Sequence, residues 1–290
     1  MKPVVVSRCF SAFAIILVIF SQMPIAKSVK AQESDAISLP LMFDLRERLQ
    51  KPDLASIPRI RFLTTVDFPP FNFIDQSGKL SGFHVDLARE ICRELNVLER
   101  CQIEAVPYKD LRTALDKGNG EVIAAGIRIT PELRRDVGIS RVFMQLPARF
   151  IIRSDVSAGI GNPSALKPGE AGVVAGTAHE AMLASYFPDL KPKTFPKRED
   201  MLAALKKGEI KAAFGDGLQL SFWQESPDAN NCCSFLGDQY YSSAFFGDGL
   251  ALITTKDAPL ITRAMDAALL ALARNGRLNE IYLRYFPNGL

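Results

Sequence analysis

Arg128 is the charged residue whose surroundings in the sequence most favour ligand chemistry. Residues 122–125 are a short apolar run followed by Gly126, which is typical of a buried strand that ends in a turn. Thr130 and Pro131 then predict the start of a helix, with Thr130 as its cap. Ligands of open α/β sheets bind beyond the carboxyl ends of strands, where backbone amides are unpaired. We therefore predict that Arg128 lies in a ligand-binding turn.

The same pattern occurs a second time along the chain. Residues 110–126 align without a gap on residues 200–216, and each copy predicts an amphipathic helix, a glycine stop and a buried strand. Two similar α/β units predict two lobes related by a pseudo-twofold axis. The alignment places Gly126 on Asp216, so a strand end that presents Arg128 corresponds to one that presents a carboxylate. If the lobes face each other, the two charges converge on one cleft, which suits a zwitterion.

Residues 171–183 predict another strand, followed by a helix that begins at Thr177. The N-terminus of a helix favours negative charge, because its amides are free and its dipole is positive there. A Thr that only caps the helix, without binding a ligand, would give the same sequence pattern. His179, one residue into this helix, is expected to be exposed.

Residues 59–66 are rich in β-forming side chains, and the Pro-rich DFPPFNF that follows is expected to be a loop without regular structure. Phe68 is assigned to the wall of a pocket, whereas the other two phenylalanines of the loop fit core packing better. A helix is predicted next, with Asp86 as its N-cap. His84 precedes that cap and is interpreted as a solvated or hydrogen-bonded turn residue.

The remaining segments position these elements. Residues 142–153 are expected to be extended and to cross into the second lobe, and residues 245–255 to form the returning strand. Trp223, the only tryptophan, is expected to pack near the cleft. Residues 41–49 predict a short amphipathic helix before the first lobe. The resulting division is a signal peptide at 1–31, an N-terminal lead at 32–58, a first lobe at 59–150 and 247–290, and a second lobe at 151–246.

The first 31 residues indicate export. Lys2 and Arg8 precede an apolar run at 10–20, and Ala31 lies where a signal peptidase would cleave. The run is short for a membrane span, so an uncleaved anchor is the lesser alternative. Cleavage removes four basic residues and no acidic one, so the 35 basic residues become 31 against 32 acidic ones. The mature chain is then almost neutral, which argues against nucleic-acid or membrane-surface binding.

The cysteines agree with export. Cys92 and Cys101 flank the end of a predicted helix and could form a disulfide in an oxidising compartment, with two buried thiols as the alternative. The adjacent Cys232 and Cys233 could form a vicinal disulfide, stay free or pair elsewhere. Histidines do not cluster near either pair, so zinc is not expected, and we expect no cofactor.

Five motifs resemble those of family 3 periplasmic solute-binding proteins, the amino-acid receptors of ABC importers, and above all the lysine/arginine/ornithine binders. They stand in the family's order between residues 59 and 286: PPFNFIDQSGKLSGFHVDLA, AAGIRITPELRRDVGIS, GVVAGTAHEAM, FFGDG and NGRLNEIYLRYFP. The resemblance implies a type II α/β fold of two lobes with a cleft and a two-strand hinge. It also implies a periplasmic monomer that delivers its ligand to an inner-membrane ABC permease. Cys92 and Cys101 match a disulfide of some members.

The resemblance further implies roles for individual residues. Phe68 matches the family's aromatic lid over the ligand, and Asp216 the acid that receives the α-ammonium group. Gly126 and Arg128 match the strand-end positions that bind the α-carboxylate, and Thr177 matches a further carboxylate donor from the second lobe.

This chain departs from the family at the carboxylate-binding arginine. That arginine normally stands three residues after the Thr of the motif, where this chain has Leu133. Either Arg128 has taken over the carboxylate, or Arg134 reaches it round the first helical turn. The preferred function is reversible capture of a small polar amino acid or related zwitterion by closure of the two lobes, without catalysis.

Two other functions stay open at this point. One is a dehydratase of the cyclohexadienyl type on the same fold, in which Asp216 or Glu180 would act as the general acid. The other is a sensory or dehydrogenase-associated binding protein without a permease.

Overall fold

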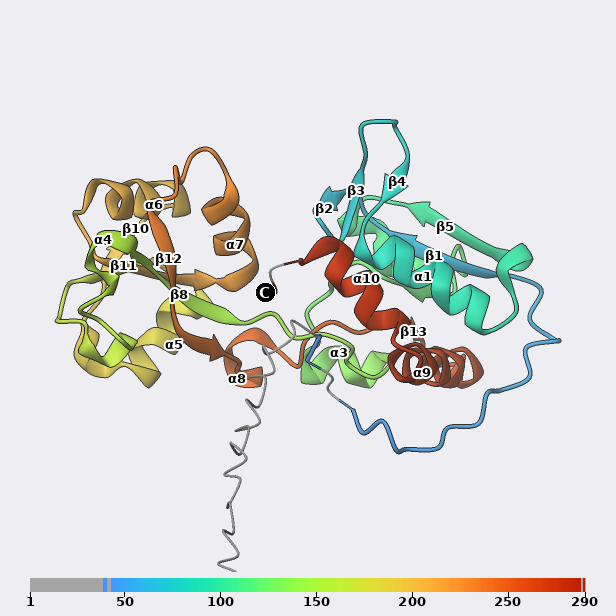
Figure 1. Cartoon of the computed structure of the whole chain (residues 1–290). Helices are drawn as coiled ribbons and strands as arrows, with labels where there is room; N and C mark the ends of the chain where they lie inside the picture. Colours follow the sequence, from blue (N-terminus) through green and yellow to red (C-terminus); the bar gives the residue numbers. More distant parts are fainter. Residues whose placement is uncertain (1–38, 41–42, 288, 290) are drawn as a thin grey trace, which may run out of the picture. The chain divides into compact units, whose positions relative to one another are not determined.

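A computed structural model describes residues 39–40, 43–287 and 289 (Figure 1). The expected signal peptide at 1–31 lies outside the described residues. The described residues belong to one compact unit. Within the described part of the chain, no helix combines the length and the apolar character needed to cross a membrane.

The first sheet has five strands in the order β5-β1-β6-β13-β7. Strand β1 pairs in parallel with β5 and β6, and β13 pairs antiparallel with β6 and β7. Residues 60 and 62–63 of β1 are buried, as expected for a central strand. The strand bounds are β1 Ile60–Thr64, β5 Cys101–Ala105, β6 Val122–Ile123, β7 Val137–Ile139 and β13 Ile253–Thr255.

The second sheet repeats this order as β10-β9-β11-β8-β12. Strand β9 pairs in parallel with β10 and β11, and β8 pairs antiparallel with β11 and β12. Strands β6 and β11, the two copies of the sequence repeat, occupy equivalent central positions, so the two-lobed α/β fold is confirmed. The bounds are β8 Ala148–Arg153, β9 Ala171–Val174, β10 Lys193–Phe195, β11 Ala212–Asp216 and β12 Cys233–Tyr240. The lobe boundaries at residues 150 and 246 stay predictions.

Helices cover both sheets. Helices α1, α9 and α10 pack against one another beside the first sheet (Figure 1). In the second sheet, Phe150 and Ile151 of β8 point to opposite apolar clusters, as alternation along a strand requires. The helices are α1 Phe83–Glu94, α2 Leu111–Asp116, α3 Pro131–Asp136, α4 Ser154–Ser157, α5 Ala178–Tyr186, α6 Arg198–Lys207, α7 Gly217–Glu225, α8 Ser243–Phe246, α9 Pro259–Arg274 and α10 Arg277–Tyr285.

The described residues contain two disulfides. Cys92 of α1 bonds to Cys101 of β5, which ties the helix to the edge of the first sheet. Cys232 and Cys233 form a vicinal disulfide at the start of β12, which decides among the three states considered for this pair.

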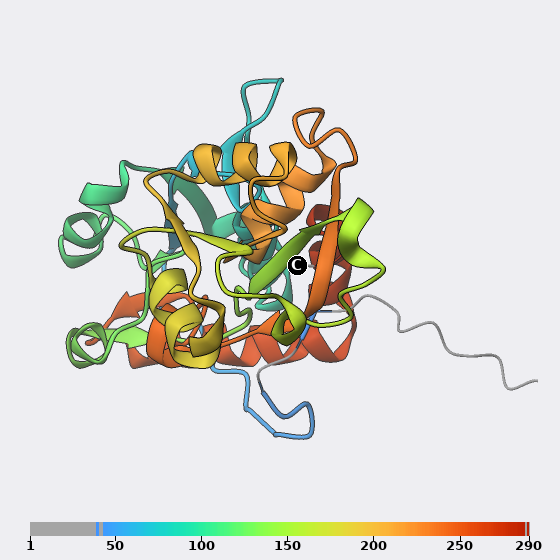
Figure 2. The same ribbon diagram turned by 90° about the vertical axis from the view of Figure 1, so that its left-hand side faces the viewer.

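The helix expected at 41–49 is wrong for the described residues 43–49, which run as a loop. This blue segment carries no helix in Figure 1 or in the turned view of Figure 2. The Asp44 carboxylate accepts the backbone N–H of Arg46 at 2.8 Å. Such a local side-chain bond competes with helical hydrogen bonds, and a short helix is marginal in any case.

The Pro-rich segment was expected to lack regular structure, but it forms a small antiparallel sheet. Its strands are β2 Asp67–Phe68, β3 Asn72–Ile74 and β4 Leu80–Ser81. The backbone N–H of Phe71 donates to the carbonyl of Phe68 at 2.8 Å and closes the first turn. Both prolines lie in that turn, where no ladder hydrogen bond needs their missing N–H. The returning segment 245–255 also differs from expectation, because only Ile253–Thr255 is a strand and α8 reaches Phe246.

Helix α1 begins earlier than predicted, with Gly82 and not Asp86 as its N-cap. Asp86 lies in the first turn and accepts the Tyr285 hydroxyl at 2.8 Å. His84 is buried, and its Nδ1 lies 2.7 Å from Oδ1 of Asn72. Burial lowers the pKa of His84 to about 3, so the ring is neutral. The hydrogen-bonded interpretation of His84 is therefore right and the solvated one is wrong.

Gly82→Ala should lower the free energy of unfolding by about 3 kcal/mol. Gly82 has φ of +128°, and a Cβ there would overlap the carbonyl of Phe71. Gly78→Ala is the matched control, since Gly78 has φ of +78° but no atom within 4 Å of the added Cβ, and should cost only about 1 kcal/mol. Chemical denaturation of both variants measures the difference. Equal losses would show that the contact with Phe71 is unimportant.

Candidate functional site

A cavity of about 1040 Å³ contains two of the predicted site residues. Phe68 of β2 lines it together with Asp216, the last residue of β11. Phe73 of β3 and both Phe222 and Trp223 of α7 complete an aromatic lining. An apolar cavity with a few charged groups is the usual form of a small-molecule site. Trp223 therefore lies where it was expected, whereas Phe73, expected in the core, faces the cavity.

Phe68 and Gly126 are in direct contact. The Phe68 ring stacks on Phe71, with ring centroids 4.8 Å apart, and Phe71 itself is fully buried. A Cβ on Gly126 would lie 2.6 Å from Cε1 of Phe68. Any larger residue at position 126 would therefore push the aromatic ring away from its place.

Arg128 lies beside Gly126 but faces a second, smaller cavity. This cavity of about 140 Å³ is lined by Gly126, Arg128, Tyr241 and Phe246, and it shares Leu146 with the large cavity. The Arg128 side chain is exposed, and its Nη2 donates to the carbonyl of Phe245 at 3.2 Å. The structure thus places Arg128 five residues after Ile123, the last residue of β6, and not on the cavity that contains Asp216.

Arg134 is engaged elsewhere. Its Nη2 and Nε lie 2.5 and 3.2 Å from Oδ2 of Asp248, so the guanidinium already pairs with a carboxylate of the chain. Arg134 is exposed and, in the described chain, lines neither of the two cavities. Asp248 is 114 residues further along the sequence, so local reasoning missed this partner.

Thr177 acts as the cap of α5. Its hydroxyl accepts the N–H of Glu180 at 3.2 Å and donates to the carbonyl of Val174 at 2.7 Å. The carboxylate of Glu180 in turn accepts the N–H of Gly176 at 2.7 Å. The amide that was expected to attract an anion therefore already binds a carboxylate of the chain itself.

Asp216 combines a structural and an electrostatic role. One carboxylate oxygen accepts the N–H of Gln219 at 2.9 Å and caps α7. Burial raises the pKa of Asp216, while the Gln219 amide and His179 oppose that rise. A desolvated carboxylate gains free energy when a cation approaches it, so this position suits a positively charged group.

His179 is half-buried and not exposed as expected. Its ring lies against Phe246, with centroids 4.8 Å apart, and edge-on to Phe214 at 6.3 Å. Burial lowers the pKa of His179. Phe246 comes from α8, 67 positions later in the sequence than His179, which explains why its local sequence did not reveal this contact.

Sequence reasoning missed the charged residues of α6. Arg198, Leu202 and Lys206 all line the large cavity and follow each other at four-residue intervals. Residues at this spacing share one helix face, and that spacing was the available signal. Arg198 also donates to Oε1 of Gln219 and so joins α6 to α7. In the described part of the chain, no three His, Cys, Asp or Glu side chains gather as a metal site would require.

Comparisons with known proteins agree with this architecture. The family model of bacterial extracellular solute-binding proteins, family 3, matches residues 60–288. The L-arginine-binding protein of Pseudomonas aeruginosa is 27% identical over 241 residues, which cover 82% of this chain and 92% of that protein. The lysine/arginine/ornithine-binding periplasmic protein of Escherichia coli is 24% identical over 240 residues, covering 80% and 89%.

A solved structure shows a similar fold. Substrate-binding domain 2 of Lactococcus lactis GlnP, in its open conformation, gives a TM-score of 0.67 at 17% sequence identity. The match covers 83% of this chain and 100% of that domain.

Asp216→Asn should leave the free energy of unfolding of the unliganded chain unchanged or higher. Asparagine still accepts the Gln219 N–H, and the buried charge is gone. Asp216→Ala should lower the free energy of unfolding by about 1 kcal/mol, because the cap of α7 is lost. Chemical denaturation at neutral pH measures both variants, and equal losses would contradict a desolvation cost at this carboxylate.

Proposed function

Because the chain belongs to the bacterial extracellular solute-binding proteins of family 3, we propose that it captures a small polar amino acid or related zwitterion. The receptor acts in the periplasm as a monomer and delivers its ligand to an inner-membrane ABC permease. The observation that carries the proposal is the shared cavity of Phe68 and Asp216, which come from different sheets. A ligand held from both sides favours closure of the two lobes, since the closed state has contacts that the open state lacks.

Asp216 receives the ligand ammonium group. Its carboxylate is half-buried and accepts backbone amides of α7, and a cation improves its environment further. Phe68 covers the ligand from the first lobe, where Gly126 leaves room for the aromatic ring. The ligand is bound and not transformed, and Asp216 holds it without acting as a general acid.

Arg128 lines the smaller cavity, which shares Leu146 with the large one, and binds the ligand carboxylate when the lobes close. Its present partner is the carbonyl of Phe245, and a carboxylate would replace that neutral acceptor with a charged, bidentate one. Arg134 is the weaker candidate, because Asp248 already satisfies its guanidinium. The amide of Gly176 adds a donor from the second lobe once Glu180 gives way, and the hydroxyl of Thr177 adds another once it leaves the carbonyl of Val174.

The two arginine assignments differ in a binding experiment. Arg128→Ala and Asp216→Ala should each weaken binding at least about tenfold, because a hydrogen bond to a charged group contributes about 1.5 to 3 kcal/mol. Arg134→Ala is the matched control and should bind like the wild type. L-Arginine is the first probe, given the names of the relatives, within a thermal-shift screen of amino acids followed by titration calorimetry. Loss of binding in Arg134→Ala alone would reverse the assignment, and unchanged affinity in Asp216→Ala would refute the ammonium site.

Binding should also weaken at acidic pH. A ligand ammonium needs the ionised carboxylate, and burial raises the pKa of Asp216 above its usual 3.8. Affinity is therefore full above the raised pKa and is lost as the pH falls through it, earlier than for an exposed aspartate. Calorimetry with L-arginine from about pH 8 down to about pH 4 measures this loss. Asp216→Asn should bind weakly throughout, and constant wild-type affinity over the whole range would contradict the assignment.

A further inference from the structure

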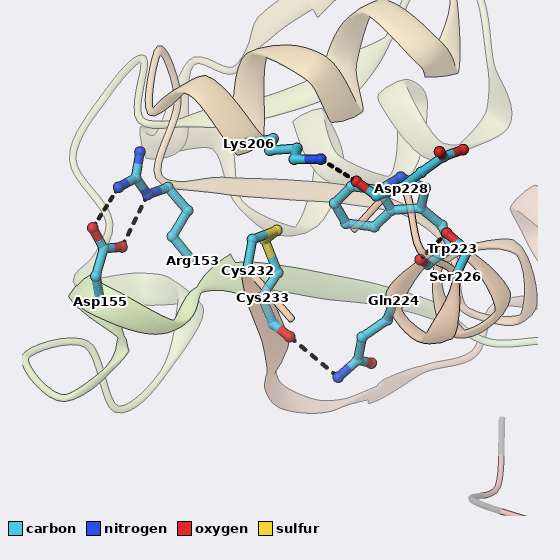
Figure 3. The surroundings of a disulfide bond; sticks show 9 residues. All are labelled: Arg153, Asp155, Lys206, Trp223, Gln224, Ser226, Asp228, Cys232 and Cys233. Carbon is cyan, nitrogen blue, oxygen red and sulfur yellow. Dashed lines mark hydrogen bonds and ion pairs between the residues drawn. A yellow bond between two sulfur atoms is a disulfide. The ribbon is translucent and has the colours of Figure 1, made fainter. Parts of the chain in front are cut away.

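The vicinal disulfide lies behind the wall of the large cavity. Cys233 is buried in an apolar cluster with Leu202 of α6 and Leu220 of α7, and Cys232 and Trp223 pack against the same cluster. Neither cysteine lines the cavity in the described chain, whereas Trp223 does. Figure 3 shows the disulfide together with Trp223 and Gln224 of α7 and Lys206 of α6.

A continuous series of hydrogen bonds joins the disulfide to Trp223. The N–H of Cys232 donates to the carbonyl of Ala229 at 3.1 Å, and the N–H of Ala229 to that of Ser226 at 3.2 Å. Ser226 donates to the carbonyl of Trp223 through its N–H at 3.0 Å and through its hydroxyl at 2.7 Å. The loop 226–232 is thus held at both ends.

The carbonyls of the two cysteines bind different elements. The carbonyl of Cys232 accepts the N–H of Ser154 in α4 at 2.8 Å. The carbonyl of Cys233 accepts the side-chain amide of Gln224 in α7 at 3.3 Å (Figure 3). Since the disulfide closes a small ring through the peptide bond between the cysteines, it restricts how the two carbonyls point relative to each other.

The loop also carries part of the cavity wall. Lys206 of α6 donates to the backbone carbonyl of Asp228 in this loop (Figure 3). Lys206, Trp223 and Asp228 all line the large cavity. A change in the loop therefore moves three lining residues together.

We propose that the Cys232–Cys233 disulfide is a positioning element of the ligand cavity, which holds Lys206, Trp223 and Asp228 in the arrangement that binds ligand. The ligand part of this inference rests on the proposed function. If the cavity wall is ordered before binding, none of the binding free energy is used to order it. A dithiol reagent breaks the S–S bond, each sulfur gains one electron and one proton, and the reagent leaves as its cyclic disulfide. The freed loop then has to be ordered again by the ligand.

Trp223 makes this inference testable without a known ligand. It is the only tryptophan of the chain, so intrinsic fluorescence reports on this wall alone. In the full chain, the double substitution Cys232→Ala, Cys233→Ala should raise the quenching of Trp223 by acrylamide. It should also weaken the binding of L-arginine by about three- to tenfold.

The matched control is the double substitution Cys92→Ala, Cys101→Ala. It removes the disulfide of the first lobe and should lower thermal stability without changing either readout. Treatment of this Cys92→Ala, Cys101→Ala control with a dithiol provides a second route, because Cys232–Cys233 is then the one disulfide left among the described residues. It should reproduce the effects of the Cys232/Cys233 variant.

Unchanged quenching and affinity in a Cys232/Cys233 variant with native circular dichroism would overturn the positioning role. Equal changes in the untreated Cys92/Cys101 control would overturn it as well, because the effect would then be general. If the wild type binds none of the amino acids, the ligand assignment fails, and the accessibility of Trp223 alone decides the positioning role.

Discussion

Withdrawal of the Asp216 carboxylate from water is the constraint on which the site depends. The same side chain ends β11, caps α7 and faces the large cavity, so the fold places a charge where its hydration is poor. A backbone amide offsets only part of the cost of removing a carboxylate from water. A positively charged guest recovers part of that cost when it approaches the carboxylate, and this gain links the fold to the ligand binding that we propose.

The two sheets show how one pattern of elements supports two different chemical surfaces. Both have the same strand order and the same mixture of parallel and antiparallel pairs, and their central strands β6 and β11 come from the repeated segment. The copies diverge where the strand ends. Gly126 has no side chain and so leaves room for the Phe68 ring, whereas Asp216 carries a negative charge.

Predictions from the sequence succeeded where the determinants are local. Apolar runs identified the central strands, and Thr130 and Thr177 both cap helices through a hydrogen bond three residues ahead. The failures at the candidate site concern partners that are distant in sequence. The Asp248 carboxylate beside Arg134 could not be inferred from hydrophobic periodicity or capping patterns, because only tertiary folding brings these segments together. The contact of His179 with Phe246 escaped for the same reason.

The hydrogen bond between Glu180 and Gly176 has a consequence for selectivity. The Glu180 carboxylate competes with any incoming anion for the Gly176 amide at this helix end. A ligand whose only polar group is a carboxylate replaces the Glu180 hydrogen bond with an equivalent one and gains little free energy. Acetate and formate should therefore bind weakly. The protein then distinguishes ligands by their other groups, because the carboxylate alone adds little to the affinity. A weak net gain at one contact can therefore increase the selectivity for the whole ligand.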